Sequence, residues 1–252
     1  MPSEVRHRVD DDRVYPVVRL DGILDAGSAP QLRAALLGVL GDQPEAVVVD
    51  VRDLTLGRRE AAGVLADVAR EAADWPGARL VLCTGAEQDG WHATGLPAEP
   101  DVEAALAGLG RPHRADFLSL ALEPVVGAAR RSRELIAEAC ARWDLVALAG
   151  PACIVVTELV NNVVAHSRTA MTVFASRRGE RLLVAVRDRS ATVPRFTGSP
   201  VPVTSYGGRG LLLIDSVAER WGALALPGGK VVWAALSRAH EQAQQAAGFG
   251  PA

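Results

Sequence analysis

The sequence predicts a two-domain α/β protein, and three observations indicate this class. The chain has 252 residues, a length typical of two domains of roughly 100–150 residues each. Short β-branched runs alternate with segments of helical period, which favours sheets covered by helices. The stretch GRPHR at 110–114 interrupts this pattern. We therefore expect a first domain over residues 1–110, a second over 111–240 and a flexible tail over 241–252.

The first domain is expected to alternate strands with helices. Its predicted strands are 14–20, 46–51 and 79–83, and its predicted helices are 28–40, 60–73 and 101–109. Ser28 is a candidate cap for the first helix, with Pro30 in the first turn, and Pro76-Gly77 ends the second helix. Strands that alternate with helices favour a partly parallel sheet.

The second domain is expected to hold more paired strands. Its predicted elements are, in order, a strand at 117–122, a helix from about 124 that carries AARRSRELIAEACARW, a helix at 155–166, strands at 172–178 and 181–188, a loop at 190–208, a helix at 210–221 and a hairpin over 224–236. The loop is predicted because it is rich in Pro, Gly, Ser and Thr and has no period. The hairpin turns at Pro227–Gly229.

Composition excludes several classes of protein. The chain is 49% hydrophobic and 23% charged with a net charge of -3, which is typical of a globular protein and does not favour direct nucleic-acid binding. The start, MPSEVRHRVDDDR, does not resemble a secretory signal, and no run approaches the roughly 18 apolar residues of a membrane span. Cys83, Cys140 and Cys153 are too widely spaced for a C-x-x-C site. We expect a cytoplasmic protein with core cysteines and no membrane contact.

The segment VVTELVNNVVAH alternates two apolar with two polar residues, a period close to that of a helix. Its polar stripe carries Glu158, Asn162 and His166, with Asn161 beside it. A solvent-facing amphipathic helix is one interpretation. However, adjacent Asn residues disfavour a helix, an Asn oxygen suits Mg²⁺, and a Glu one turn earlier can accept a proton. These residue types therefore favour a phosphoryl-transfer site.

Two later segments carry groups that such a site needs. Asp188 ends a strand, where its carboxylate can accept a hydrogen bond from the amino group of a base, although it can also simply turn the chain. GGRGL at 207–211 opens an apolar helix, and backbone N–H groups at a helix start favour a phosphate. A G-x-G pattern alone is weak evidence.

The order of these motifs resembles the GHKL ATPase superfamily, and within it the anti-sigma-factor serine kinases. The motifs are E-L-x-x-N-x-x-x-H on a helix, a strand-end Asp, a loop, G-x-G-L and a closing hairpin, over residues 113–238. The resemblance implies a Bergerat-type α/β sandwich that binds ATP and Mg²⁺. It implies that Glu158 is the general base, that Asn162 is the Mg²⁺ ligand and that Asp188 contacts the adenine. It also implies that the phosphates are bordered by Gly208, Arg209, Gly210 and Leu211. Contacts to the partner or the phosphate would come from Arg130 and His166.

The sequence departs from that family after the adenine-contacting Asp. The family usually has x-Gly there, whereas this chain reads Asp188-Arg189-Ser190, with Thr192 where a second Gly often stands. A residue with a side chain adopts such a turn less freely than glycine. We therefore expect a reduced affinity for the nucleotide.

The first domain resembles the STAS fold of anti-sigma-factor antagonists over 14–108, through LDGILDAGSAPQLRAAL and AVVVDVRDLTLGRREAAGVL. That family carries a phosphorylated serine before its second helix. This chain has Arg58-Arg59-Glu60-Ala61 there and no hydroxyl residue between Gly57 and Val64. The resemblance therefore implies a docking or dimerisation domain rather than a phosphorylation target.

Two functions follow as expectations. The first is a serine kinase and anti-sigma-type regulator that acts on a separate STAS-domain antagonist. The second is a non-catalytic, nucleotide-gated module that captures partners with both domains. The expected partners are a sigma factor or a STAS-domain antagonist, and a homodimer is left open. A sensor histidine kinase is disfavoured because no paired-helix segment with a phosphoacceptor His precedes the second domain.

Overall fold

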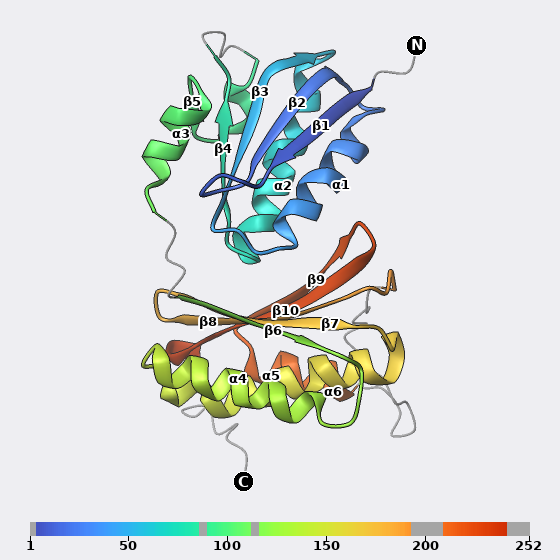
Figure 1. Ribbon diagram of the computed structural model, residues 1–252, viewed down its shortest axis with the longest axis vertical. Helices are drawn as coiled ribbons and strands as arrows, with labels where there is room; N and C mark the ends of the chain where they lie inside the picture. Colours follow the sequence, from blue (N-terminus) through green and yellow to red (C-terminus); the bar gives the residue numbers. More distant parts are fainter. Residues whose placement is uncertain (1–3, 86–89, 112–115, 193–208, 241–252) are drawn as a thin grey trace. The chain divides into compact units, whose positions relative to one another are not determined.

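The chain forms two compact units, residues 1–113 and 114–252, close to the predicted boundary at residue 110. The structure is a computed structural model, and it describes residues 4–85, 90–111, 116–192 and 209–240 (Figure 1). The tail predicted over 241–252 and most of the loop predicted over 190–208 lie outside the described residues. Each unit has its own sheet and its own helices.

The N-terminal unit is built on a five-stranded mixed sheet in the order β1-β2-β3-β4-β5. Its strands are β1 (Val5–Asp10), β2 (Val17–Leu24), β3 (Ala46–Leu56), β4 (Arg79–Cys83) and β5 (Ala98–Glu99). β1 pairs with β2 antiparallel, and the other pairs are parallel, as the alternation of strands and helices predicts. The charged start of the chain is therefore a strand, which was not predicted because VRHRVD has only two apolar residues, Val5 and Val9, among charged and polar ones.

Helices cover both faces of this sheet. α1 (Ala29–Leu40) and α2 (Gly63–Asp74) lie together on one face, and α3 (Val102–Leu109) packs on the other against a cluster that includes Val17, Val48 and Val81 (Figure 1). Pro30 lies in the first turn of α1 as predicted. The Ser28 hydroxyl does not cap α1, because it donates to Ile23 O at 3.0 Å instead.

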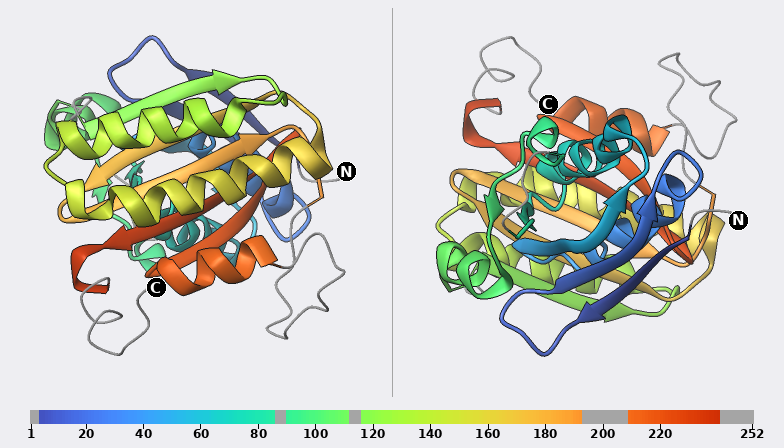
Figure 2. Two further views of the ribbon diagram at one scale, coloured as in Figure 1. Left: turned by 90° about the horizontal axis from the view of Figure 1, so that it is seen from below. Right: turned by 90° about the horizontal axis from the view of Figure 1, so that it is seen from above.

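The C-terminal unit is a two-layer α/β sandwich. Its antiparallel sheet has the order β6-β7-β8-β10-β9, formed by β6 (Phe117–Leu122), β7 (Met171–Arg178), β8 (Arg181–Asp188), β9 (Arg220–Leu226) and β10 (Gly229–Ser237). One face is covered by α4 (Ala128–Arg142), α5 (Ala149–Asn162) and α6 (Arg209–Val217), seen from the helix side in the left view of Figure 2. A π-helical segment (Val163–Ser167) continues α5.

The predicted helix over 210–221 is too long. α6 ends at Val217, and β9 begins at Arg220. The backbone N–H of Glu219 donates to Ala235 O at 2.9 Å, so the chain has left the helix and already pairs with β10. Trp221 lies in β9, and its indole N–H donates back to Asp215 of α6 at 2.9 Å.

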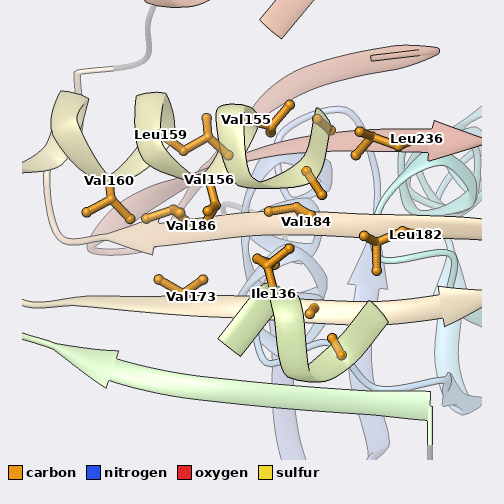
Figure 3. Packing of buried hydrophobic residues seen from close by; sticks show 14 of the residues in the cluster. Ile136, Val155, Val156, Leu159, Val160, Val173, Leu182, Val184, Val186 and Leu236 are labelled. Carbon is orange, nitrogen blue, oxygen red and sulfur yellow. The ribbon is translucent and has the colours of Figure 1, made fainter. Parts of the chain in front are cut away.

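The core of this unit lies between the helices and the sheet. The apolar face of α5 supplies Val155, Val156, Leu159 and Val160, which pack on side chains of the central strands such as Val186 (Figure 3). The two-on, two-off pattern of the sequence therefore marks a helix with one buried face. The opposite stripe of α5 is left for polar residues.

α5 and its extension bear on the expectation of no membrane contact. The helical stretch Val146–Ser167 has 22 residues and a mean hydropathy of 1.5, so by length and composition alone it could cross a membrane. The stretch does not stand out as a continuous apolar run, because Glu158 and two Asn residues interrupt it. Here one face of the helix packs on the sheet, and a buried core helix satisfies the same test.

The three cysteines are free thiols, as their spacing predicts. Cys83 and Cys140 are buried in the cores, and Cys153 is half-buried. Burial raises the pKa of the Cys83 thiol to about 12 and that of Cys140 to about 11. Both thiols are therefore protonated and unreactive at neutral pH.

Candidate functional site

A cavity of about 360 Å³ opens in the C-terminal unit beside α5. Its walls come from the end of α5 and the π-helical segment, the end of β8, the start of β10 and the first turn of α6. The side chains that line it are Leu159, Asn162, Val163, His166, Ser167, Val186, Asp188, Ser190, Thr192, Leu211, Lys230 and Val232. Apolar walls with a few convergent polar groups are typical of a small-molecule site.

The cavity brings together site residues that the sequence predicts from three separate segments. Asn162, His166, Asp188 and Leu211 all line it. Glu158 lies one turn before Asn162 on α5, outside the cavity wall. Gly208 lies outside the described residues. Arg209 begins α6, but its side chain is not described.

Glu158 lies against the first turn of α6. A Cβ atom added at Gly210 would stand 2.6 Å from Glu158 Oε2, closer than real contacts allow. Glycine at this position therefore lets α6 approach the carboxylate. The half-buried Glu158 side chain consequently faces the end of α6 where backbone N–H groups attract an anion.

Asp188 forms a buried ion pair with Lys230. The two residues stand opposite each other in the antiparallel pairing of β8 with β10, so their side chains share the helix-covered face. Lys230 Nζ donates to Asp188 Oδ1 at 2.9 Å and lies 2.8 Å from Oδ2. Asp188 is 3% exposed and Lys230 is 6% exposed. Lys230 also donates to Ser167 Oγ at 3.0 Å.

The backbone beside this pair requires glycine. A Cβ atom at Gly229 would stand 2.0 Å from the carbonyl oxygen of Asp188, a distance that no side chain tolerates. Gly229 therefore allows β10 to begin directly against the end of β8. Lys230, the next residue, is thereby held opposite Asp188.

The turn after Asp188 forms without the family's glycine. The backbone N–H of Ser190 donates to Asp188 Oδ1 at 2.7 Å, so the carboxylate stabilises its own turn. Among the described residues other than glycine, positive φ angles occur at Gln43, Asp144 and Arg168, not at Ser190. Glycine is consequently not required by the backbone conformation at this position.

The π-helical segment changes the polar stripe at its end. Glu158 and Asn162 lie one turn apart on regular α5, whereas His166 follows in the wider π turns and is exposed. The segment ends at Arg168, whose left-handed backbone lets its N–H donate to Val163 O at 2.7 Å. The wider turns place Ser167 on the cavity wall beside Lys230.

Arg130 lies in a separate hollow of about 1000 Å³ beside the β6–α4 connection. Its guanidinium is 3.7 Å from the Glu134 carboxylate, and the side chain is 74% exposed. Arg131, Arg187 and Arg189 line the same hollow. Arg130 is therefore not brought into the 360 Å³ cavity, although Asp188 borders both hollows.

The position that carries the phosphorylated serine in the STAS resemblance is basic in this structure. Arg59 begins a short 3₁₀ turn, Arg59–Ala62, directly before α2. Arg59 and Glu60 are both exposed. The side chains at the start of α2 therefore offer charge on the surface but no hydroxyl group.

Among the described residues, no cluster of three or more His, Cys, Asp or Glu side chains could hold a metal by itself. Asn162 nevertheless supplies one amide oxygen on the cavity wall, one turn from Glu158 on α5. Mg²⁺ is commonly held by one or two such protein oxygens together with substrate phosphates. The donor set therefore fits a magnesium ion that arrives with a nucleotide, and does not fit a permanent metal centre.

Lys230 is the principal residue of the cavity that the sequence analysis missed. A charge at the start of the otherwise apolar strand KVVWAAL was the available signal. Its pairing with Asp188 could not be read, because β9 and α6 separate the two strands in sequence.

No family model matches the chain, and no curated protein matches it. Among solved structures, it is similar to an anti-sigma factor antagonist from Mycobacterium paratuberculosis, with 28% identity and a TM-score of 0.36 over 41% of this chain and 92% of that chain. It is also similar to the RsbU and RsbW domains of a Mycobacterium tuberculosis protein, with 17% identity and a TM-score of 0.36 over 48% of this chain and 31% of that chain.

The anti-sigma factor antagonist SpoIIAA in its unphosphorylated form is a third similar structure, with 16% identity and a TM-score of 0.33 over 41% of this chain and 96% of that chain. Two of the three are anti-sigma factor antagonists. The chain spans about a third of the protein that carries the RsbU and RsbW domains.

Proposed function

We propose that the C-terminal unit binds ATP with Mg²⁺ and transfers the terminal phosphoryl group to a serine of a separate STAS-domain antagonist. The protein would then be a cytoplasmic anti-sigma-type regulator. One observation carries the proposal: the buried Asp188 carboxylate and Leu211 of the first turn of α6 line one cavity, and Glu158 lies against that turn just outside the cavity wall. The nucleobase needs the buried carboxylate, and the reacting phosphate needs the helix N-terminus with Glu158 beside it.

The nucleobase would lie at the part of the cavity that Asp188 lines. Asp188 is buried there, and the apolar side chains of Val186 and Val232, which pair across β8 and β10, line the same cavity. A purine base packs on such walls, and its exocyclic amino group donates to a carboxylate. In a site of low dielectric this hydrogen bond is stronger than in water.

The phosphate end lies at the first turn of α6. Backbone N–H groups at a helix start bind phosphate oxygens, and Gly210 leaves room for the Glu158 carboxylate beside this helix start. Glu158 accepts the proton of the acceptor serine as its hydroxyl oxygen bonds to the γ-phosphorus, and the bond from that phosphorus to the bridging oxygen of ADP breaks. General-base catalysis of this kind supplies about 10²–10⁴-fold in rate.

Asn162 would hold the magnesium ion through its amide oxygen, together with the nucleotide's phosphates. When bound, the ion offsets negative charge on the transferred phosphoryl group. Without the ion, the negative charges of Glu158 and of the phosphates would repel each other. Asn162, one turn from Glu158, adds an oxygen ligand without adding further negative charge.

The resemblance of the first domain to the STAS fold implies that the acceptor serine belongs to another protein. Arg59 stands near the place of the family's serine, so the N-terminal unit has no hydroxyl to receive the phosphate there. The hollow lined by Arg130, Arg131 and Arg189 would contact the antagonist or a sigma factor. An acidic surface on that partner would complement its charge.

Glu158→Gln tests the proposed chemistry. The amide keeps the size of the side chain but cannot act as the base, so transfer to a cognate antagonist should fall about 10²–10⁴-fold. The dissociation constant for Mg-ATP should change by less than about threefold, because the base contacts remain. Transfer is measured with γ-labelled ATP, and binding is measured by calorimetry.

Asn161→Ala is the matched control, since Asn161 is exposed on the same helix and does not line the cavity. It should leave transfer and binding as in the wild type. If Glu158→Gln transfers phosphate at the wild-type rate, Glu158 is not the base.

A second candidate function is a non-catalytic module in which the nucleotide only sets conformation. The Asp188–Lys230 pair favours it, because the carboxylate is already compensated in the absence of a ligand. Binding of Mg-ATP without transfer to any STAS-domain antagonist would support this alternative over the kinase.

A further inference from the structure

The cavity contains a second charged group that the proposed chemistry does not use. Lys230 is 6% exposed, lines the cavity and is held by Asp188 and by Ser167 Oγ. An ammonium group has three N–H donors. These two described partners take two of them, which leaves a third donor for a molecule in the cavity.

Asp188 likewise keeps an acceptor. Lys230 Nζ and the Ser190 N–H both donate to Oδ1, at 2.9 and 2.7 Å. Oδ2 is buried and lies 2.8 Å from Nζ, but among the described residues it accepts no hydrogen bond. The ammonium compensates the charge of this oxygen, and a carboxylate oxygen has two lone pairs, so Oδ2 can still accept a hydrogen bond from a ligand's donor.

We propose that Lys230 and Asp188 together bind the C6–N1 edge of a purine, so that the site accepts 6-keto purine nucleotides as well as ATP. This inference rests on the proposed nucleotide function. With adenine, the C6 amino group donates to Asp188 Oδ2, and N1 accepts from Lys230. With hypoxanthine or guanine, the C6 oxygen accepts from Lys230, and N1–H donates to Asp188.

A carboxylate alone would distinguish the two kinds of base. A C6 oxygen that faces Asp188 would place two acceptors together with no proton between them, and such an unpaired buried group costs affinity. Lys230 removes this cost because the ammonium stands beside the carboxylate. The apolar side chains of Leu159, Val186 and Val232 exclude water from the pair, which strengthens both hydrogen bonds.

Inosine triphosphate is the appropriate probe, because hypoxanthine differs from adenine only at C6 and N1. We expect the wild-type full chain to bind Mg-ITP within about threefold of Mg-ATP, a free-energy difference below the value of one charged hydrogen bond. In Lys230→Met, which retains the aliphatic stem, ITP should bind at least about tenfold more weakly than ATP. The ratio of the two dissociation constants is the readout, so a general loss of affinity cancels.

A second variant is needed if Lys230→Met does not fold, because that substitution leaves the buried Asp188 carboxylate without its cation. Asp188→Leu combined with Lys230→Met replaces the ion pair by apolar side chains, a change that buried pairs often tolerate. Its ITP-to-ATP ratio should be close to one, with both nucleotides bound weakly. Arg168→Met, which removes a positive charge from the exposed residue next to Ser167 and outside the 360 Å³ cavity, should keep the wild-type ratio and affinities.

Two results would overturn the role of Lys230 and leave ATP binding intact. The first is wild-type protein that binds ITP at least about tenfold more weakly than ATP. The second is a Lys230→Met variant with the wild-type ratio. If neither nucleotide binds the wild type, the proposed nucleotide function fails as well.

Discussion

At the scale of single residues, buried charge is paired across neighbouring strands in both units. Asp50 of β3 meets Arg19 of β2 at 3.0 Å and Arg52 at 2.8 Å, and Asp188 of β8 meets Lys230 of β10. A buried carboxylate without a cation would cost several kcal/mol. Each pair therefore allows a carboxylate to lie among apolar side chains. The two pairs differ in that Asp188 lines the 360 Å³ cavity and Asp50 does not.

Asp50 gives a pH-dependent prediction for the N-terminal unit. Burial alone would raise the pKa of Asp50, but hydrogen bonds from Arg52 and the charges of Arg52 and Arg19 outweigh it and hold the pKa below its usual value of 3.8. A folded-state pKa below the unfolded one stabilises the fold above the unfolded pKa. That stability is lost as the pH falls through the folded value.

We therefore expect Asp50→Asn to flatten the loss of stability of this unit below about pH 4. Urea unfolding of wild type and variant at several pH values between neutral and acid is the measurement. Asp67→Asn is the control, since the pair of Asp67 with Arg70 is exposed on both sides and should contribute little. Identical pH dependence in wild type and Asp50→Asn would contradict this account.

At the scale of elements, regions with strong period were predictable and regions set by pairing were not. The sequence predicts β4 and β6 with the observed bounds, because β-branched or apolar runs are bounded there by Pro, Gly or polar residues. β1 and the first residues of β9 were missed. Their sequences, VRHRVD and RW, carry charge or bulk that only strand pairing explains.

The contact of α5 with α6 yields a prediction at the same scale. Gly210→Ala places a Cβ 2.6 Å from Glu158 Oε2 in the present arrangement, so the carboxylate or the first turn of α6 must shift. We expect a fall in phosphoryl transfer of at least about tenfold, since misplacement by an ångström can cost about 10² in rate.

Gly150→Ala is the matched control on α5, because nothing lies within 4 Å of an added Cβ there. It should leave transfer unchanged and stabilise the protein by up to about 1 kcal/mol, as alanine does in helices. Equal transfer by Gly210→Ala and Gly150→Ala would show that the approach of α6 to Glu158 does not matter for catalysis.

At the scale of the whole molecule, the sequence indicates both units and most of one site. Glu158 and Asn162 were predicted from helical spacing, and Asp188 from its place at a strand end; the structure places Asn162 and Asp188 on one cavity and Glu158 beside Gly210. Lys230 was not predictable, because antiparallel register between non-consecutive strands is decided by packing of the whole sheet. Arg130, predicted as a contact to partner or phosphate, lies in the other hollow.

The central claim is that the C-terminal unit binds a nucleotide in the cavity beside α5. Calorimetric titration of the full chain with Mg-ATP tests it most directly. We expect saturable binding at a single site, and much weaker binding by the Asp188→Leu, Lys230→Met double variant with its melting temperature maintained. A wild-type chain that shows neither heat of binding nor displacement of a fluorescent ATP analogue at millimolar Mg-ATP would contradict it.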